Sequence, residues 1–312
     1  MAIYLDPKND FVFKRIFGNH PGLLISFLNA LMPLEPGRVI ESIEYVPNEL
    51  VPDNPAKKFS VVDVRCRDNY GRQFIVEMQM EWSSAFPGRM LFNAAKTYVQ
   101  QLGSGKIYTD LHPVYALAIL NGSYDSETDE FYHRYQIANR ENTNEVIEGL
   151  ELIMVELPKF TAKNWSDRRM AVLWLRFLTE IKHGAEFVPE DLLTDEAIRE
   201  AAGICEKGGF TEVELAVYDK NWDTILNELS VITASIEKGE KKGIAKGLEE
   251  GLAKGREEGR EEGEKKGREE GSHEKTVQVI LNCARKGMSK EDIADIVHLS
   301  VEEVAAILEK TD

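Results

Sequence analysis

The stretch from Phe59 to Trp82 constrains the fold more than any other part of this 312-residue chain. Two runs rich in Val, Ile and Phe flank the turn-forming residues 68–71, which is the pattern of a β-hairpin. Side chains alternate between the two faces of a strand. If the apolar faces of the two strands coincide, Asp63 lies opposite Glu77, and Gly71 supplies the positive φ that the connection needs.

The same alternation separates polar from apolar side chains along the hairpin. The apolar face is expected to carry Val62, Val64, Cys66, Phe74, Val76, Met78 and Met80. The opposite face is expected to carry Ile75 and the polar residues Asp63, Arg65, Arg67, Gln73, Glu77 and Gln79. Two carboxylates that face each other across a strand pair repel, and a divalent cation between them would relieve the repulsion. A hairpin with a solvated polar face is the alternative interpretation of this pattern.

Asp63 followed after the turn by Glu77-x-Gln79 resembles the Asp…Glu-x-Lys/Gln core of the PD-(D/E)XK nuclease superfamily. The surrounding sequence is similar to one branch, the recombination-promoting nucleases, also described as PD-(D/E)XK nuclease family transposases. Gln79 stands where the superfamily more often has Lys, and Gln is usual in this branch. The matching segments, in the expected order over about residues 5 to 122, are Asn9–Gly18, Glu77–Gln79, Arg89, Tyr98-x-x-Gln101 and Gly105-x-x-Tyr108-x-x-Leu111-x-Pro113-Val114.

The resemblance implies an α/β fold with a restriction-endonuclease-like mixed sheet core, flanking helices and a helical C-terminal part. It also implies a metal-dependent endonuclease that hydrolyses DNA phosphodiester bonds and is linked to recombination, mobile elements or defence. Asp63 and Glu77 would then bind Mg²⁺ or another divalent cation. Gln79 would complete the catalytic set by positioning the attacking water.

Four further residues are secondary candidates for the site. In the resembled superfamily an acid of the first helix often assists the metal site, a position that Asp10 occupies. Lys14, one turn later, is placed to contact phosphate, although Asp10 also suits the helix dipole and the two residues also form an i,i+4 ion pair. Tyr98 and Gln101, on a helix predicted over 86–102, would line the edge of the site, and core packing is the alternative for Tyr98.

The charge of the chain argues against tight non-specific DNA binding. The formal net charge is −16, whereas DNA binding draws on Lys and Arg that neutralise phosphates. The basic residues near the hairpin are Lys8, Lys14, Arg15, Lys57, Lys58, Arg65, Arg67, Arg72, Arg89 and Lys96. A local basic strip of this kind keeps the nuclease interpretation open. The alternative is a catalytically inactive DNA-binding or oligomeric regulatory protein that retains the nuclease fold.

The compartment follows from the cysteines and from the lack of long apolar runs. Cys66, Cys205 and Cys283 are far apart and odd in number, which predicts neither a disulfide framework nor a zinc site. No apolar run reaches the length of a membrane helix, and the N-terminus lacks the layout of a signal peptide. We therefore expect a cytoplasmic protein that has no membrane partner.

Four parts are expected along the chain: a nuclease-like core over 1–160, a helical cover over 161–236, a charged spacer over 237–272 and a three-helix module over 273–312. Within the core, the patterns predict helices over 7–18 and 22–31, strands over 39–46, 136–140 and 150–157, and a loop over 47–55. The nearly continuous apolar run Pro113–Leu120 predicts a central strand of the sheet. Helices are expected near 170–181, 195–205 and 213–236.

Glycine recurs at every fourth position from Gly239 to Gly271, among Glu, Lys and Arg. Because each glycine costs a helix about 1 kcal/mol relative to alanine, we expect a solvated, nascently helical spacer rather than a dimer zipper. The module after it resembles a helix-turn-helix, but Glu302, Glu303 and Glu309 on its third helix would repel phosphate. A protein-binding role is favoured, with homo-oligomerisation through this small module.

Overall fold

The computed structural model of the protein describes residues 2–51, 58–80, 83–103, 105–125, 127–163, 165 and 168–310. The chain divides into two units, Met1–Val231 and Ile232–Asp312. The helices are α1 Asp10–Phe17, α2 Pro21–Leu31, α3 Phe86–Val99, α4 Arg169–Glu180, α5 Glu196–Ile204, α6 Glu212–Arg285, α7 Lys290–Val297 and α8 Val301–Glu309. The strands are β1 Ile43–Tyr45, β2 Glu49–Leu50, β3 Ser60–Val61, β4 Val64–Asp68, β5 Gln73–Gln79, β6 Val114–Leu120, β7 Tyr132–Ala138 and β8 Val146–Glu156.

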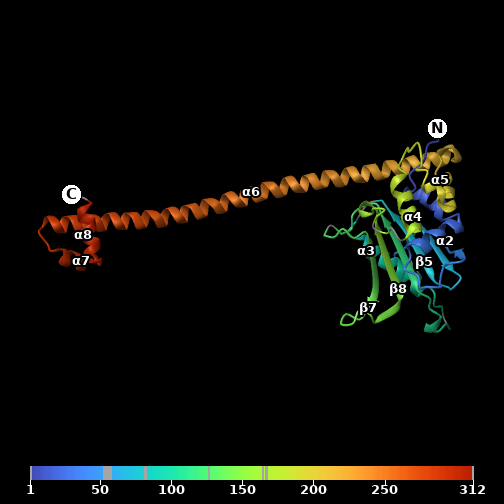
Figure 1. Ribbon diagram of the computed structural model, residues 1–312, viewed down its shortest axis with the longest axis horizontal. Helices are drawn as coiled ribbons and strands as arrows, with labels where there is room; N and C mark the ends of the chain where they lie inside the picture. The colour runs from blue at the N-terminus through green and yellow to red at the C-terminus, as the bar shows by residue number, and fades with distance from the viewer. Residues whose placement is uncertain are drawn as a thin grey trace. The chain divides into compact units, whose positions relative to one another are not determined.

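The first unit is built on a six-stranded mixed sheet with the order β1-β4-β5-β6-β8-β7 (Figure 1). Strands β5, β6 and β8 run parallel, and the remaining pairs are antiparallel. The apolar strand β6 lies between β5 and β8, as its unbroken run of apolar residues predicts. The predicted α/β class with a mixed sheet and flanking helices is confirmed.

The hairpin has the register that the alternation predicts. Val64 pairs with Val76 and Cys66 pairs with Phe74, so continuation of the ladder by one residue sets Asp63 opposite Glu77. Gly71 turns the chain with a φ of 78°. A β-carbon on Gly71 would lie 2.7 Å from the His112 ring, so both the backbone angle and the packing require glycine here.

The first strand of the hairpin is interrupted, which corrects part of the prediction. Strand β3 pairs with β2, and β2 lies inside the segment 47–55 that was expected to be a loop. Strand β4 begins only at Val64. The Val62 amide donates to the Asn48 carbonyl at 3.0 Å. Val62 therefore packs in the cluster on the α3 side of the sheet, not with Val64 and Cys66, because the chain bends between the two strands.

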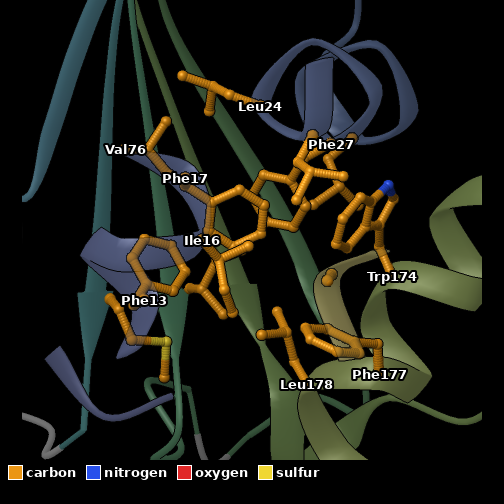
Figure 2. Close-up of a cluster of buried hydrophobic side chains, with 14 of the residues drawn as sticks. Phe13, Ile16, Phe17, Leu24, Phe27, Val76, Trp174, Phe177 and Leu178 are labelled. Atoms are coloured by element: carbon orange, nitrogen blue, oxygen red, sulfur yellow. The ribbon is translucent and has the colours of Figure 1, made fainter. Parts of the chain in front are cut away.

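Apolar cores cover both faces of the sheet. On one face, α1, α2, α4 and α5 pack against strand residues such as Val76, and Figure 2 shows the aromatic side chains gathered there. The Phe17 ring centroid lies 4.5 Å from that of Phe27 and 5.4 Å from that of Trp174. Trp174 comes from the predicted helical cover, so this helix shares the core of the sheet. On the other face, α3 packs over the inner strands through Met90.

Helix α1 begins later than the sequence suggests. Its N-cap is Asn9, whose side chain accepts from the Phe11 amide, whereas the predicted helix starts at residue 7. Asp6 is buried and forms an ion pair with Lys8 at 2.9 Å. The later start places Asp10 in the first turn, and Gly18 ends the helix as predicted.

The glycine repeat is helical throughout, as part of the 74-residue helix α6. This differs from the nascently helical spacer that the cost of glycine predicts. Ion pairs at i,i+4, such as Glu262–Lys266 at 2.8 Å, recur along the repeat and offset a part of that cost. The role of residues 237–272 as a spacer stays a prediction.

The end of α6, with α7 and α8, encloses a small apolar cluster of Ile280, Ile293, Ala294 and Val304. Ser300 caps α8 and forms a capping box with Glu303. Among the described residues, no helix is both long and apolar enough to cross a membrane.

Candidate active site

The structure brings Asp63, Glu77 and Gln79 to the wall of one cavity of about 620 Å³. Asp63 lies at the bend between β3 and β4, and Glu77 and Gln79 lie two residues apart on β5, so they share a strand face. Helix α3 supplies the opposing wall, which includes Arg89 and Asn93. The cavity thus forms where the break between β3 and β4, the end of the inner strand β5 and the covering helix α3 meet.

Asp63 is held by a backbone amide and by an amine. Its Oδ2 accepts from the Met78 amide at 2.8 Å, and its Oδ1 lies 3.2 Å from Lys14 Nζ. Burial is the main cause that raises the pKa of Asp63, to about 7, and the charge of Lys14 opposes this shift. The carboxylates of Asp10 and Glu77 raise the pKa further.

Glu77 is similarly buried, with 8% of its surface exposed. The Asn93 Nδ2 donates to Glu77 Oε1 at 3.0 Å, and Arg89 Nη2 lies 3.7 Å from Oε2. Burial raises the pKa of Glu77, and both neighbours oppose this rise. Two desolvated carboxyl groups in one cavity, each with a raised pKa, form a site of unfavourable negative charge.

Arg89 connects Gln79 to this arrangement, since its guanidinium donates to Gln79 Oε1. It brings positive charge next to Gln79. The roles of Arg89 and Asn93 were not identified from sequence. Their i,i+4 spacing on a predicted helix puts them on one face, but only the packing of α3 shows that this face meets Glu77.

Lys14 joins the two acids that the sequence placed near the site. Its Nζ lies 2.7 Å from Asp10 Oδ1 and 3.2 Å from Asp63 Oδ1. Although burial disfavours the charged amine, Asp63 and Asp10 together raise the pKa of Lys14 above its ordinary value. The i,i+4 ion pair and the position beside Asp63 are therefore both present.

Tyr98 and Gln101 lie away from this cavity. Tyr98 packs with the apolar cluster on the α3 side of the sheet and closely approaches Gly149. Gln101 Nε2 donates to the His112 carbonyl at 2.9 Å, and its Oε1 accepts from the His112 amide at 3.0 Å. Neither residue lines the cavity of Asp63 and Glu77, so the structure assigns both to packing and loop support.

The predicted basic strip is only partly available at the surface. Lys8 and Arg72 are buried in ion pairs with Asp6 and Asp68, and Lys57 lies outside the described residues. A second cavity of about 640 Å³ adjoins Asp63 on the side of α1. Its wall contains the basic residues Lys14, Arg15, His20 and Arg65.

The residues present fit a divalent cation with few protein ligands. Within the described part of the chain, no group of three or more His, Cys, Asp or Glu side chains forms a metal cluster. Asp63 and Glu77 offer hard carboxylate oxygens in one cavity. Their raised pKa values show that their negative charges are unfavourable there, and a bound cation would compensate these charges. One or two carboxylates completed by water and phosphate are the usual ligands of Mg²⁺.

Comparison with known proteins supports the resemblance and extends it beyond residue 122. The sequence model of the family described as "PD-(D/E)XK nuclease family transposase" matches residues 7–235. This range contains α1, the whole mixed sheet, and the helices α2 to α5 that cover it. No curated protein and no solved structure matches the chain. The match spans well over half of the sequence, and the chain therefore belongs to the PD-(D/E)XK nuclease family transposases.

Proposed function

We propose that this protein is a metal-dependent DNA endonuclease that hydrolyses phosphodiester bonds. The observation that carries the proposal is the meeting of Asp63 and Glu77, with Gln79, in the wall of one cavity. The family provides the expectation of nuclease chemistry. Mg²⁺ or another divalent cation is the proposed cofactor, DNA is the proposed substrate, and the cytoplasm is the proposed compartment.

In this mechanism Asp63 and Glu77 hold the cation. When bound, the cation lowers the pKa of a water molecule and stabilises the negative charge that develops on the phosphate. The Met78 amide fixes the orientation of the Asp63 carboxylate, since it donates to Oδ2. Lys14 compensates the charge of Asp63 and, from the wall of the adjoining cavity, is placed to donate to a phosphate oxygen of the substrate.

Gln79 positions the attacking water. Its Oε1 accepts from Arg89, which fixes the orientation of the amide group. A neutral glutamine supplies no positive charge to the transition state. The guanidinium of Arg89, which lies 3.7 Å from Glu77 Oε2, supplies this positive charge instead. Asp10 keeps the Lys14 amine in place at 2.7 Å from its Oδ1.

The test is cleavage of supercoiled plasmid by purified full-length protein in Mg²⁺, Mn²⁺, Ca²⁺ or EDTA. We expect cleavage that depends on a divalent cation, and its loss in Asp63→Ala and Glu77→Ala, by about 10³-fold or more. Glu44→Gln is the matched control, because Glu44 is an exposed carboxylate on the neighbouring strand β1 and pairs with Arg67. Undiminished cutting by both alanine variants would place the activity elsewhere and refute this site.

A further inference from the structure

Asn93 is a buried polar residue of the cavity wall whose contacts are only half satisfied. It is 2% exposed on α3, and its Nδ2 donates to Glu77 Oε1 at 3.0 Å. Because an ionised carboxylate only accepts hydrogen bonds, the amide nitrogen must face Glu77 and the oxygen must face away. Asn93 Oδ1 is buried and has no hydrogen-bond partner among the described residues.

Stability does not account for an asparagine at this position. Its neighbours on the helix, Met90 and Ala94, pack against the apolar strand residues Ile75 and Ala118. A buried amide that leaves its oxygen unpaired destabilises the folded state, and an apolar side chain of similar size would avoid this cost. The hydrogen bond to Glu77 is therefore the feature that distinguishes Asn93 from the leucine that packing alone would favour.

The two neighbours of Glu77 contact different oxygens of its carboxylate. Asn93 donates to Oε1, and Arg89 Nη2 lies 3.7 Å from Oε2. The side chain of Arg89 is 47% exposed, whereas Asn93 is enclosed. A neutral, enclosed donor fixes the rotation of the carboxylate without cancelling its charge, and leaves Oε2 outside the hydrogen bond with Asn93.

We propose that Asn93 is a positioning residue that holds Glu77 in the orientation needed to bind a divalent cation together with Asp63. The inference rests on the proposed function, because it assigns a role at the same site. Groups that hydrogen-bond a metal-binding carboxylate orient it, and their loss typically weakens metal affinity by about 10- to 100-fold. Asn93 thus tunes affinity for the cation without touching it.

The test measures Mn²⁺ binding to the full-length protein by titration calorimetry in the absence of DNA. Asn93→Leu is expected to weaken Mn²⁺ affinity by about tenfold or more. Its melting temperature in EDTA should change little, because the loss of a buried unpaired oxygen offsets the loss of the hydrogen bond to Glu77. Thr97→Val is the matched control: Thr97 lies one turn along the same helix, is fully buried and has an unpartnered Oγ1 among the described residues. Its Mn²⁺ affinity should equal that of the wild type.

Unchanged Mn²⁺ affinity in Asn93→Leu would overturn the positioning role. A lower melting temperature of that variant in EDTA together with unchanged Mn²⁺ affinity would mark Asn93 as a packing residue. Glu77→Gln separates this proposal from the one on which it rests. If the wild type binds no Mn²⁺, or Glu77→Gln binds it as the wild type does, the cation site itself fails, and the role of Asn93 fails with it.

Discussion

At the scale of single residues, the half-buried carboxylate of Asp63 and the fully buried carboxylate of Glu156 have opposite electrostatic surroundings. Asp63 has a pKa raised to about 7, chiefly by burial. Burial also opposes the charge of Glu156, but hydrogen bonds hold the pKa of Glu156 below its ordinary value. A carboxylate left under-compensated in a cavity is typical of a functional site, whereas a fully bonded one is typical of a structural anchor. The two residues therefore predict opposite dependences of stability on pH.

Asp63→Asn should stabilise the cation-free protein at high pH. The folded state holds a proton on Asp63 up to about pH 7, while the unfolded chain releases it near pH 4. The wild type therefore loses stability as the pH rises through this window, and the variant does not. In EDTA we expect equal free energies of unfolding near pH 4 and a gain of about 4 kcal/mol for the variant at pH 8. Urea unfolding at both pH values measures this.

Glu44→Gln is again the control for the Asp63 experiment, since this exposed carboxylate should leave the pH dependence unchanged. A variant Asp63→Asn that loses stability relative to the wild type as the pH rises would contradict the assignment. Such a result would mean that the contacts with Lys14 and the Met78 amide outweigh the cost of burial.

Glu156→Gln should destabilise the protein at neutral pH. Glu156 is fully buried at the end of β8 and accepts from the Tyr124 amide at 2.7 Å and from Lys159 Nζ at 3.0 Å. It also lies 2.6 Å from His133 Nε2. Loss of one partner of a buried ion pair costs about 3 kcal/mol or more, because the cation is left uncompensated.

The depressed pKa of Glu156 sets the sign of its pH dependence. The stabilisation is present above the pKa of the unfolded chain and is lost as the pH falls through the lower folded value. Urea unfolding should therefore show a deficit for Glu156→Gln at pH 7 that narrows below about pH 4. A deficit that stays constant with pH would instead indicate a steric effect of the substitution.

Residue patterns predicted the hairpin register well and the walls of the site less well. Alternation of side chains fixed Asp63 opposite Glu77, because a slip of one residue would bury charged groups. The same alternation misplaced Val62, since it carries no information about the bend at Asp63. Asn93 and Arg89 could not be assigned, because the angle at which a helix crosses a sheet depends on packing.

At the scale of elements, apolar runs in the sequence predicted the position of a buried strand well and the ends of exposed strands poorly. Strand β6 has almost no polar residue and was placed in the centre. Strand β7 begins at Tyr132, four residues before the predicted start, and β8 begins at Val146, also four residues early. The missed ends are the partly exposed parts at the sheet edge, where polar and apolar residues are both tolerated.

Helix α6 should gain stability when glycines of its repeat are replaced. A β-carbon at Gly251, Gly255 or Gly259 would meet no atom within 4 Å. Each glycine-to-alanine change favours the helix by about 1 kcal/mol. The triple variant should show higher helical content and slower amide hydrogen exchange over residues 247–263 than the wild type.

Gly71→Ala provides the contrasting control for the glycine experiment. Gly71 has a φ of 78° and lies against His112, so alanine there should lower the melting temperature of the protein. If the triple variant exchanges no more slowly than the wild type, the repeat is held in a helix by something other than its intrinsic propensity. A partner chain would then be the explanation to examine.

At the scale of the whole molecule, the candidate site and the large apolar core belong to the first unit. Asp63, Glu77 and Gln79 lie in Met1–Val231, and the family match ends at residue 235. Among the described residues of the second unit there is one small cluster, in which Ile280, Ile293 and Val304 are fully buried. So small a core supplies little stability by itself, which favours association with a further copy. The homo-oligomer remains a proposal.

A chain that ends at Ile236 should therefore fold and retain metal-dependent cleavage, but lose self-association. It keeps α1, the sheet, α3 and the part of α6 that packs on the first unit through Tyr218. Light scattering on the full and truncated chains measures the oligomer, and plasmid cleavage with Mg²⁺ measures the activity. Asp63→Ala in the truncated chain is the control for contaminating nuclease. An insoluble truncation would show that residues 237–312 stabilise the nuclease fold, and an unchanged oligomer would place the interface in the first unit, on the helices that cover the sheet.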